Sequence, residues 1–165
     1  MTGVVVNDTS VLIDLIKLGL LEVFAHSKFE LWIPDFVHNE IIDQKDEFEK
    51  YIKHFNVYEF TSEEVFELYV KHANNPELSL VDISVLHVAE KKEMVLCTSD
   101  NALRKKAQYF GVDAHGLLWI LEELLKQGVL KKKEVVKQAK RYLKLNSWIS
   151  KDIVREFVKR IEDEY

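Results

Sequence analysis

The sequence has a single cysteine, Cys97, among its 165 residues, which excludes a disulfide framework and any cysteine-based zinc site. It has only two prolines and five glycines, and no linker rich in either, so one domain is predicted. No apolar run approaches the length of a membrane span. The amino terminus enters an apolar run without the basic segment of a signal peptide. We therefore expect a cytoplasmic protein that does not contact a membrane.

Several catalytic motifs are also missing. The sequence has no Gly-rich phosphate-binding loop, no G-x-S-x-G elbow and no H-E-x-x-H pair. His38 and Glu40 have the H-x-E spacing of zinc deaminases, but the P-C-x-x-C that those enzymes need is absent. These absences disfavour nucleotide binding of the common kinds, serine hydrolysis and zinc chemistry.

Charge is distributed unevenly along the chain, although the net value is only −5. Residues 1–100 hold 8 basic and 19 acidic side chains, whereas residues 101–165 hold 15 basic and 9 acidic ones. Two interpretations remain open at this point. Either acidic and basic faces compensate each other in the fold, or an acidic metal-binding half lies beside a basic surface for a polyanion.

Short apolar runs alternate with longer amphipathic ones, which is typical of a parallel sheet covered on both faces by helices. Strands are predicted at residues 4–6, 29–33, 94–98 and 112–114, with 56–60 as either a strand or a loop. Helices are predicted at residues 11–18, 35–43, from 62 after a capping box, 80–91, 102–110, 117–127, 132–145 and 151–164. In such sheets ligands bind at the carboxyl ends of the strands.

Two aspartates directly follow predicted strands. Asp8 comes after residues 4–6 and Asp100 after residues 94–98, and a predicted helix follows each of them. One interpretation is helix capping, because aspartate is favoured at that position. The other is a ligand site, because two carboxylates at one sheet edge repel each other unless a cation lies between them. Their equivalent positions favour the second interpretation.

Two further acidic residues can join this pair. Glu40 lies among apolar residues in the predicted helix at 35–43, where a charge either faces solvent or is paired. Asp82 lies in the first turn of the helix that Ser79 caps. Its other interpretation is the reciprocal partner of a capping box, although aspartate fills that role less well than glutamate.

Four segments resemble, in the same order, the acidic motifs of PIN-domain nucleases. They are Asn7-Asp8-Thr9-Ser10, Val37-His38-Asn39-Glu40, Leu78 to Ala89 around Asp82, and Thr98-Ser99-Asp100-Asn101. Order, context and spacing agree over residues 3–125, and the sequence is most similar to the VapC-like toxins of toxin–antitoxin pairs.

The resemblance implies a fold, a three-layer α/β/α sandwich with a central parallel sheet. It places a PIN-like nuclease domain at residues 1–128 and a helical extension, packed on the same domain, at 129–165. It also implies a homodimer, a small antitoxin protein as partner, and RNA as substrate.

The resemblance further implies a Mg²⁺- or Mn²⁺-dependent endoribonuclease that hydrolyses phosphodiester bonds by in-line attack. Its catalytic and metal-binding residues would be Asp8, Glu40, Asp82 and Asp100. Its polar helpers would be Thr9, Ser10, Thr98 and Asn101. Asn101 stands where many relatives have a further acid, which would weaken a second metal site. Oxygen ligands of this kind suit hard divalent cations.

A basic stripe is predicted on the helix at 132–145, formed by Lys133, Lys137, Lys140, Arg141 and Lys144. Val136, Ala139 and Leu143 are expected to dock the opposite face on the domain. The stripe is interpreted either as a surface that contacts RNA phosphates or as a solvated face that balances the acidic body.

Two other functions are alternatives to the nuclease. A non-catalytic PIN-like module would hold RNA or a protein without metal. A receiver-like phosphoacceptor is disfavoured, because the first strand offers one acid only. His115 is predicted in a turn, and the three tryptophans are predicted to pack in the core rather than to stack on bases; they are Trp32, Trp119 and Trp148.

Overall fold

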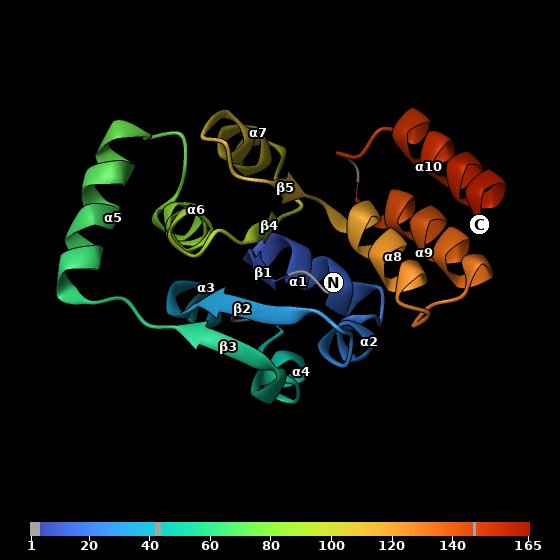
Figure 1. The fold of residues 1–165 in the computed structure, drawn as a ribbon, viewed down its shortest axis with the longest axis horizontal. Helices are drawn as coiled ribbons and strands as arrows, with labels where there is room; N and C mark the ends of the chain where they lie inside the picture. Colours follow the sequence, from blue (N-terminus) through green and yellow to red (C-terminus); the bar gives the residue numbers. More distant parts are fainter. Residues whose placement is uncertain (1–3, 42–43, 147) are drawn as a thin grey trace.

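Five parallel strands form the central sheet, in the order β3-β2-β1-β4-β5 (Figure 1). The strands are β1 (Val4–Asn7), β2 (Glu30–Pro34), β3 (Phe55–Tyr58), β4 (Val95–Cys97) and β5 (Ala114–His115). The structure is a computed structural model that describes residues 4–41, 44–146 and 148–165.

Helices cover both faces of this sheet. They are α1 (Thr9–Lys17), α2 (Leu21–Ala25), α3 (Asp35–Glu40), α4 (Lys45–Glu49), α5 (Ser62–Asn74), α6 (Leu80–Lys92), α7 (Asn101–Tyr109), α8 (Leu117–Lys126), α9 (Lys132–Leu145) and α10 (Lys151–Glu164). Helix α1 packs with α3 and α8, whereas α6 packs on β1, β2 and β4 and is covered by α5. The predicted three-layer α/β/α architecture is confirmed.

The chain changes direction across the sheet between β1 and β4. From β1 it proceeds outward through β2 to β3, and it then returns to the other side of β1 as β4 and β5. Neighbouring parallel strands at such a switch point leave a crevice at their carboxyl ends. Asp8 follows β1 there, and its backbone N–H donates to the carbonyl oxygen of Cys97 at the end of β4 (2.9 Å).

One hydrophobic core extends from the sheet into both helical layers. Helix α6 is buried at every position from Ile83 to Ala89, because the sheet lies on one side of it and α5 on the other. This is why its sequence lacks an amphipathic pattern. The extension packs on α8, and the guanidinium of Arg160 in α10 donates two hydrogen bonds to Glu122 of α8 (2.6 and 2.7 Å).

Most predicted elements occur within two residues of their expected limits, and α9 has its predicted limits. Helix α1 begins at Thr9 rather than Val11, because the hydroxyl of Ser10 donates a hydrogen bond to Asp8 and does not cap the helix. Residues 55–58 form a strand and not a loop. Helix α3 ends at Glu40 rather than near residue 43, and residues 42–43 lie outside the described residues. No helix in the described part of the chain is long and apolar enough to cross a membrane.

Three short elements were not predicted, and one residue was misplaced. Helices α2 and α4 have five residues each, and a 3₁₀ turn covers Ile52–His54. Such short elements depend on tertiary packing more than on local sequence signals. His115 belongs to β5 rather than to a turn, and it pairs with Cys97 of β4.

The predicted docking face of α9 was also inexact. Val135, Ala139 and Tyr142 are its buried residues. Val136 and Leu143 are half-buried against the core, and Leu143 also lines a groove between α9 and α10. The hydrophobic face is therefore rotated by about one residue from the prediction.

Candidate active site

Asp8 is a buried carboxylate that does not cap the helix behind it. It occupies the N-cap position of α1, yet its side chain makes no capping hydrogen bond. Its Oδ2 instead accepts hydrogen bonds from Ser10 Oγ (2.7 Å) and Thr98 Oγ1 (2.8 Å). The side chain is 4% exposed. The capping interpretation is therefore wrong for Asp8, whose orientation is fixed by one hydroxyl from α1 and one from the end of β4.

The pKa of Asp8 reflects this setting. Burial, followed by the charge of Asp82, raises it, and the net pKa moves from 3.8 to about 6. The hydrogen bonds from Ser10 and Thr98 act in the opposite direction. A carboxyl group with such a pKa is poorly satisfied as an anion by the protein alone.

The other three predicted acids have protein partners of their own. Glu40 ends α3 and accepts a hydrogen bond from Thr9 Oγ1 (2.5 Å), which joins α3 to α1. Asp82 completes the capping box of α6 by accepting from the backbone of Ser79 (2.9 Å). Asp100 caps α7 through the backbone N–H groups of Ala102 (2.8 Å) and Leu103 (3.2 Å). Capping is thus real for Asp82 and Asp100.

The four carboxylates nevertheless influence one another through Asp82. Burial raises the pKa of Asp82, and the charges of Asp100 and Glu40 add to that increase. Asp82 in turn raises the pKa of Asp8. Three carboxylates whose charges interact with that of Asp82, with oxygen donors only, match the chemistry of a hard divalent cation. Within the described residues, however, no three acidic, histidine or cysteine side chains already enclose a metal position.

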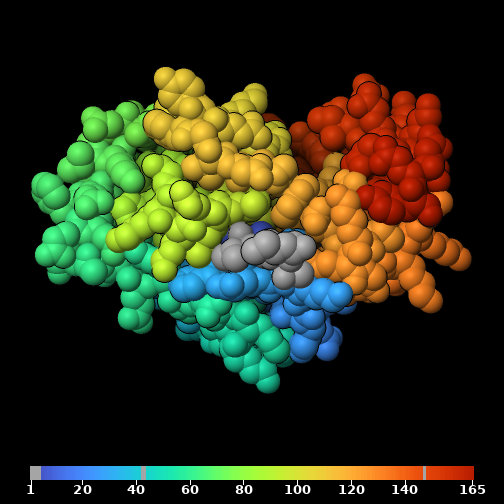
Figure 2. Space-filling model, viewed as in Figure 1, coloured from blue at the N-terminus to red at the C-terminus, as the bar shows by residue number. Residues whose placement is uncertain are grey.

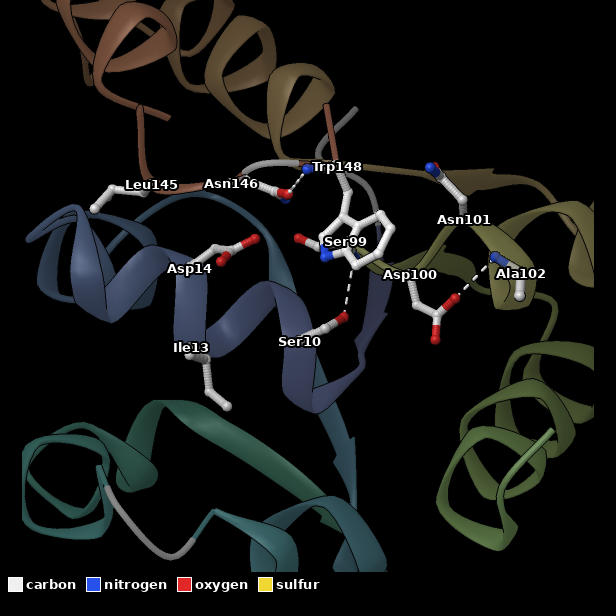
Figure 3. A pocket seen from close by; sticks show the side chains of 10 residues that line it. All are labelled: Ser10, Ile13, Asp14, Ser99, Asp100, Asn101, Ala102, Leu145, Asn146 and Trp148. Atoms are coloured by element: carbon white, nitrogen blue, oxygen red, sulfur yellow. Dashed lines mark hydrogen bonds between the residues drawn. The ribbon is translucent and has the colours of Figure 1, made fainter. Parts of the chain in front are cut away.

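A cavity of about 580 Å³ opens beside Asp100 (Figure 3). Ser10 and Asp14 project toward it from α1, and Asp100 with Asn101 lies on the opposite side. Its lining residues are Ser10, Ile13, Asp14, Ser99, Asp100, Asn101, Ala102, Leu145, Asn146 and Trp148. The cavity therefore joins the acidic edge of the sheet to the segment between α9 and α10.

Several of these lining residues were missed by the sequence reasoning. Asp14 could have been found, because it follows Ser10 by one helical turn and shares its face of α1. Asn146 and Trp148 carry no local signal, since only the packing of the extension brings them to the sheet edge. Among the predicted helpers, Asn101 accepts a hydrogen bond from Arg104 instead of contacting an acidic side chain.

The family profile of the PIN domain matches residues 4–163. The chain belongs to the PIN-domain family. The matched range includes all four acidic motifs and continues through α9 into α10. No curated protein matches the chain.

A solved structure has a similar fold. The crystal structure of PAE2754 from Pyrobaculum aerophilum aligns with a TM-score of 0.54 at 22% sequence identity. The alignment covers 77% of this chain and 100% of that one. At this identity the likeness concerns the fold.

Proposed function

We propose that this PIN-domain protein is an endoribonuclease that hydrolyses RNA phosphodiester bonds with Mg²⁺ or Mn²⁺. The observation that carries the proposal is the environment of Asp8. Its side chain is buried, does not cap α1, and accepts hydrogen bonds from two hydroxyl groups. The charge of Asp82 also acts on it and raises its pKa. A purely structural residue does not need a buried negative charge next to another carboxylate. A cation site does, because the cation compensates both charges.

The four carboxylates have distinct places around the proposed metal. Asp8 has its orientation fixed by Ser10 and Thr98, and Glu40 is held by Thr9. Asp82 and Asp100 stand at the amino termini of α6 and α7. A divalent cation there would lower the pKa of a bound water and compensate charge on the phosphate.

A finer proposal concerns the biological setting. The resemblance to VapC-like toxins supports a toxin that forms a homodimer and is inhibited by a small antitoxin protein in the cytoplasm. A small gene for a DNA-binding protein directly upstream would support this setting. An isolated gene would argue for a nuclease outside a toxin–antitoxin pair.

The alternative is a non-catalytic module that binds RNA or protein. One observation favours it: within the described ranges no metal-enclosing group is already assembled, and Asp82 and Asp100 are engaged as caps. Calorimetric titration with Mn²⁺ and an RNA-cleavage assay separate the two proposals. Stoichiometric Mn²⁺ binding, with cleavage that EDTA abolishes and Mn²⁺ restores, supports the nuclease. Absence of both supports the module.

We expect the lysine stripe of α9 to contribute to RNA binding. Lys137, Lys140 and Lys144 are exposed, whereas Arg141 donates to the carbonyl of Leu18 at the end of α1 (3.2 Å). Replacing the three lysines by Gln should weaken RNA binding. It should also reduce the log–log salt slope by about 2, at roughly 0.7 for each lost phosphate contact.

Fluorescence anisotropy with labelled single-stranded RNA at several salt concentrations measures this slope. Mn²⁺ binding should stay unchanged and serves as the control for folding. Wild-type affinity and slope in the triple variant would show that the stripe is only a solvated face.

A further inference from the structure

A second cavity adjoins the candidate active site. It measures about 500 Å³ and shares Ser99, Asn101, Asn146 and Trp148 with the first cavity. Its other walls come from α7, the start of α8, Tyr142 of α9 and the beginning of α10. The space-filling view shows α7 and α10 on either side of a hollow (Figure 2). Its size lies within the range of pockets that hold small ligands.

Trp148 stands between the two cavities. Its indole is 87% exposed and projects into the first cavity between Asn146 and Asp100 (Figure 3). The expectation that it packs in the core is therefore wrong. Its backbone N–H donates to Asn146 Oδ1 (2.9 Å), and Asn146 Nδ2 in turn donates to the hydroxyl of the buried Tyr142 (2.9 Å). The backbone that carries the ring is thus tied to α9.

The second cavity also contains positive charge. Arg104 and Lys105 line it from α7, and in the described part of the chain neither forms an ion pair with an acidic side chain. Arg104 donates to the amide oxygen of Asn101, and Gly116 leaves the room that its guanidinium occupies. A Cβ at residue 116 would lie 3.0 Å from Arg104 Nη1.

We propose that Trp148, Arg104 and Lys105 form a nucleotide subsite next to the acidic cluster, in which the indole stacks on a base of single-stranded RNA. This inference rests on the proposed function, because it assumes that RNA is the substrate. Aromatic rings beside cationic side chains are the usual platform for unpaired bases. Arg104 and Lys105 face the adjacent phosphates, and the subsite continues into the edge that holds Asp100.

RNA fits this subsite better than a protein segment does. The cavity combines the exposed ring of Trp148 with two cationic side chains that lack acidic partners in the described residues. Phosphates supply the matching negative charge at regular spacing, and every base offers a face for stacking. A nucleotide bound here would also bring a phosphate of the RNA next to the carboxylates that are proposed to cleave it.

The test compares variants in an Asp8→Asn background, so that cleavage does not disturb binding measurements in Mn²⁺. The probe is a labelled RNA strand of about ten nucleotides. Trp148→Ala should weaken its affinity by about 5-fold to 100-fold, whereas Trp148→Phe should retain most of it. Tyr109→Ala is the matched control, because Tyr109 is 80% exposed on α7 but lines neither cavity.

A fully abasic strand of the same length separates stacking from charge. Trp148→Ala and its parent should bind that strand equally, while Arg104→Gln with Lys105→Gln should weaken binding of both strands. Gly116→Ala, which displaces the Arg104 guanidinium without a change of charge, should weaken both strands to a smaller extent.

Unchanged RNA affinity in Trp148→Ala overturns the proposal and leaves the cavity to a protein partner. An equal loss on RNA and on the abasic strand overturns it as well. Failure of the proposed function looks different. In that case the unmutated chain binds RNA through Trp148 but does not cleave it with any divalent cation.

Discussion

Replacing Asp8 by Asn should stabilise the metal-free protein at neutral pH by up to about 3 kcal/mol and abolish metal-dependent RNA cleavage. Burial and the charge of Asp82 outweigh the hydrogen bonds from Ser10 and Thr98 and raise the pKa of this carboxyl from 3.8 to about 6. Each pKa unit corresponds to about 1.4 kcal/mol. Because the folded state favours the neutral acid, the stabilising contribution of protonated Asp8 is fully present below pH 3.8. It is lost as the pH rises through about 6. Asparagine carries no charge and retains an oxygen for Ser10 and Thr98.

Urea unfolding in EDTA at several pH values measures this effect. The variant and the wild type should differ little near pH 4, and the difference should grow until about pH 6 and then level off. Asp163→Asn, which removes an exposed carboxylate from α10, is the charge control and should have little effect. Full RNA cleavage by purified Asp8→Asn protein, with contaminating nuclease excluded, would contradict the catalytic assignment.

Replacing Glu64 by Gln should have the opposite effect and destabilise the protein by about 3 kcal/mol at pH 7. Burial alone would raise the pKa of Glu64, but hydrogen bonds from Tyr58, His87 and Lys91 outweigh it and lower the pKa from 4.5 to about 2. Tyr58 Oη lies 2.7 Å, His87 Nε2 2.9 Å and Lys91 Nζ 3.2 Å from Glu64 Oε2. The ionised carboxylate thereby joins α5 to α6 and β3.

The stabilising contribution of Glu64 is present above pH 4.5 and is lost as the pH falls through about 2. Thermal or urea unfolding should therefore show a difference between wild type and Glu64→Gln that shrinks over this acidic range. Glu67→Gln is the control on the exposed side of the same helix. Equal stability of Glu64→Gln and wild type at pH 7 would show that the ionised carboxylate of Glu64 does not stabilise the fold. RNA cleavage should be unaffected, because Glu64 is bonded to Tyr58, His87 and Lys91 and to none of the four candidate carboxylates.

The sheet and its long helices could be predicted because their signals are local. The hydroxyl caps at Thr61, Ser79 and Ser150 all form the expected hydrogen bonds. Strand and helix alternation predicted the parallel topology, and Asp8 and Asp100 follow β1 and β4 as expected. Helices α2 and α4 escaped prediction because five residues offer too little periodicity.

The candidate site was less predictable, for physical reasons that differ between residues. Sequence could not decide between capping and ligation for Asp8, Asp82 and Asp100, because both roles use a carboxylate at a helix start. The structure shows caps at two of them and none at Asp8. For Trp148 the sequence predicts packing rather than base stacking, whereas the residue is 87% exposed. Its exposure depends on how α9 and α10 dock, which no local pattern encodes.

The burial of Cys97 gives the protein an internal reporter. This thiol is free and fully buried on β4, and burial raises its pKa. Its reaction with a thiol reagent requires a transient opening that separates β4 from its neighbours, and the rate of labelling measures the free energy of that opening. The backbone N–H of Asp8 donates a hydrogen bond to the carbonyl oxygen of Cys97, so the same opening separates Asp8 from β4 and disrupts the carboxylate cluster. Labelling of one native side chain thus follows the integrity of the acidic edge without any added probe.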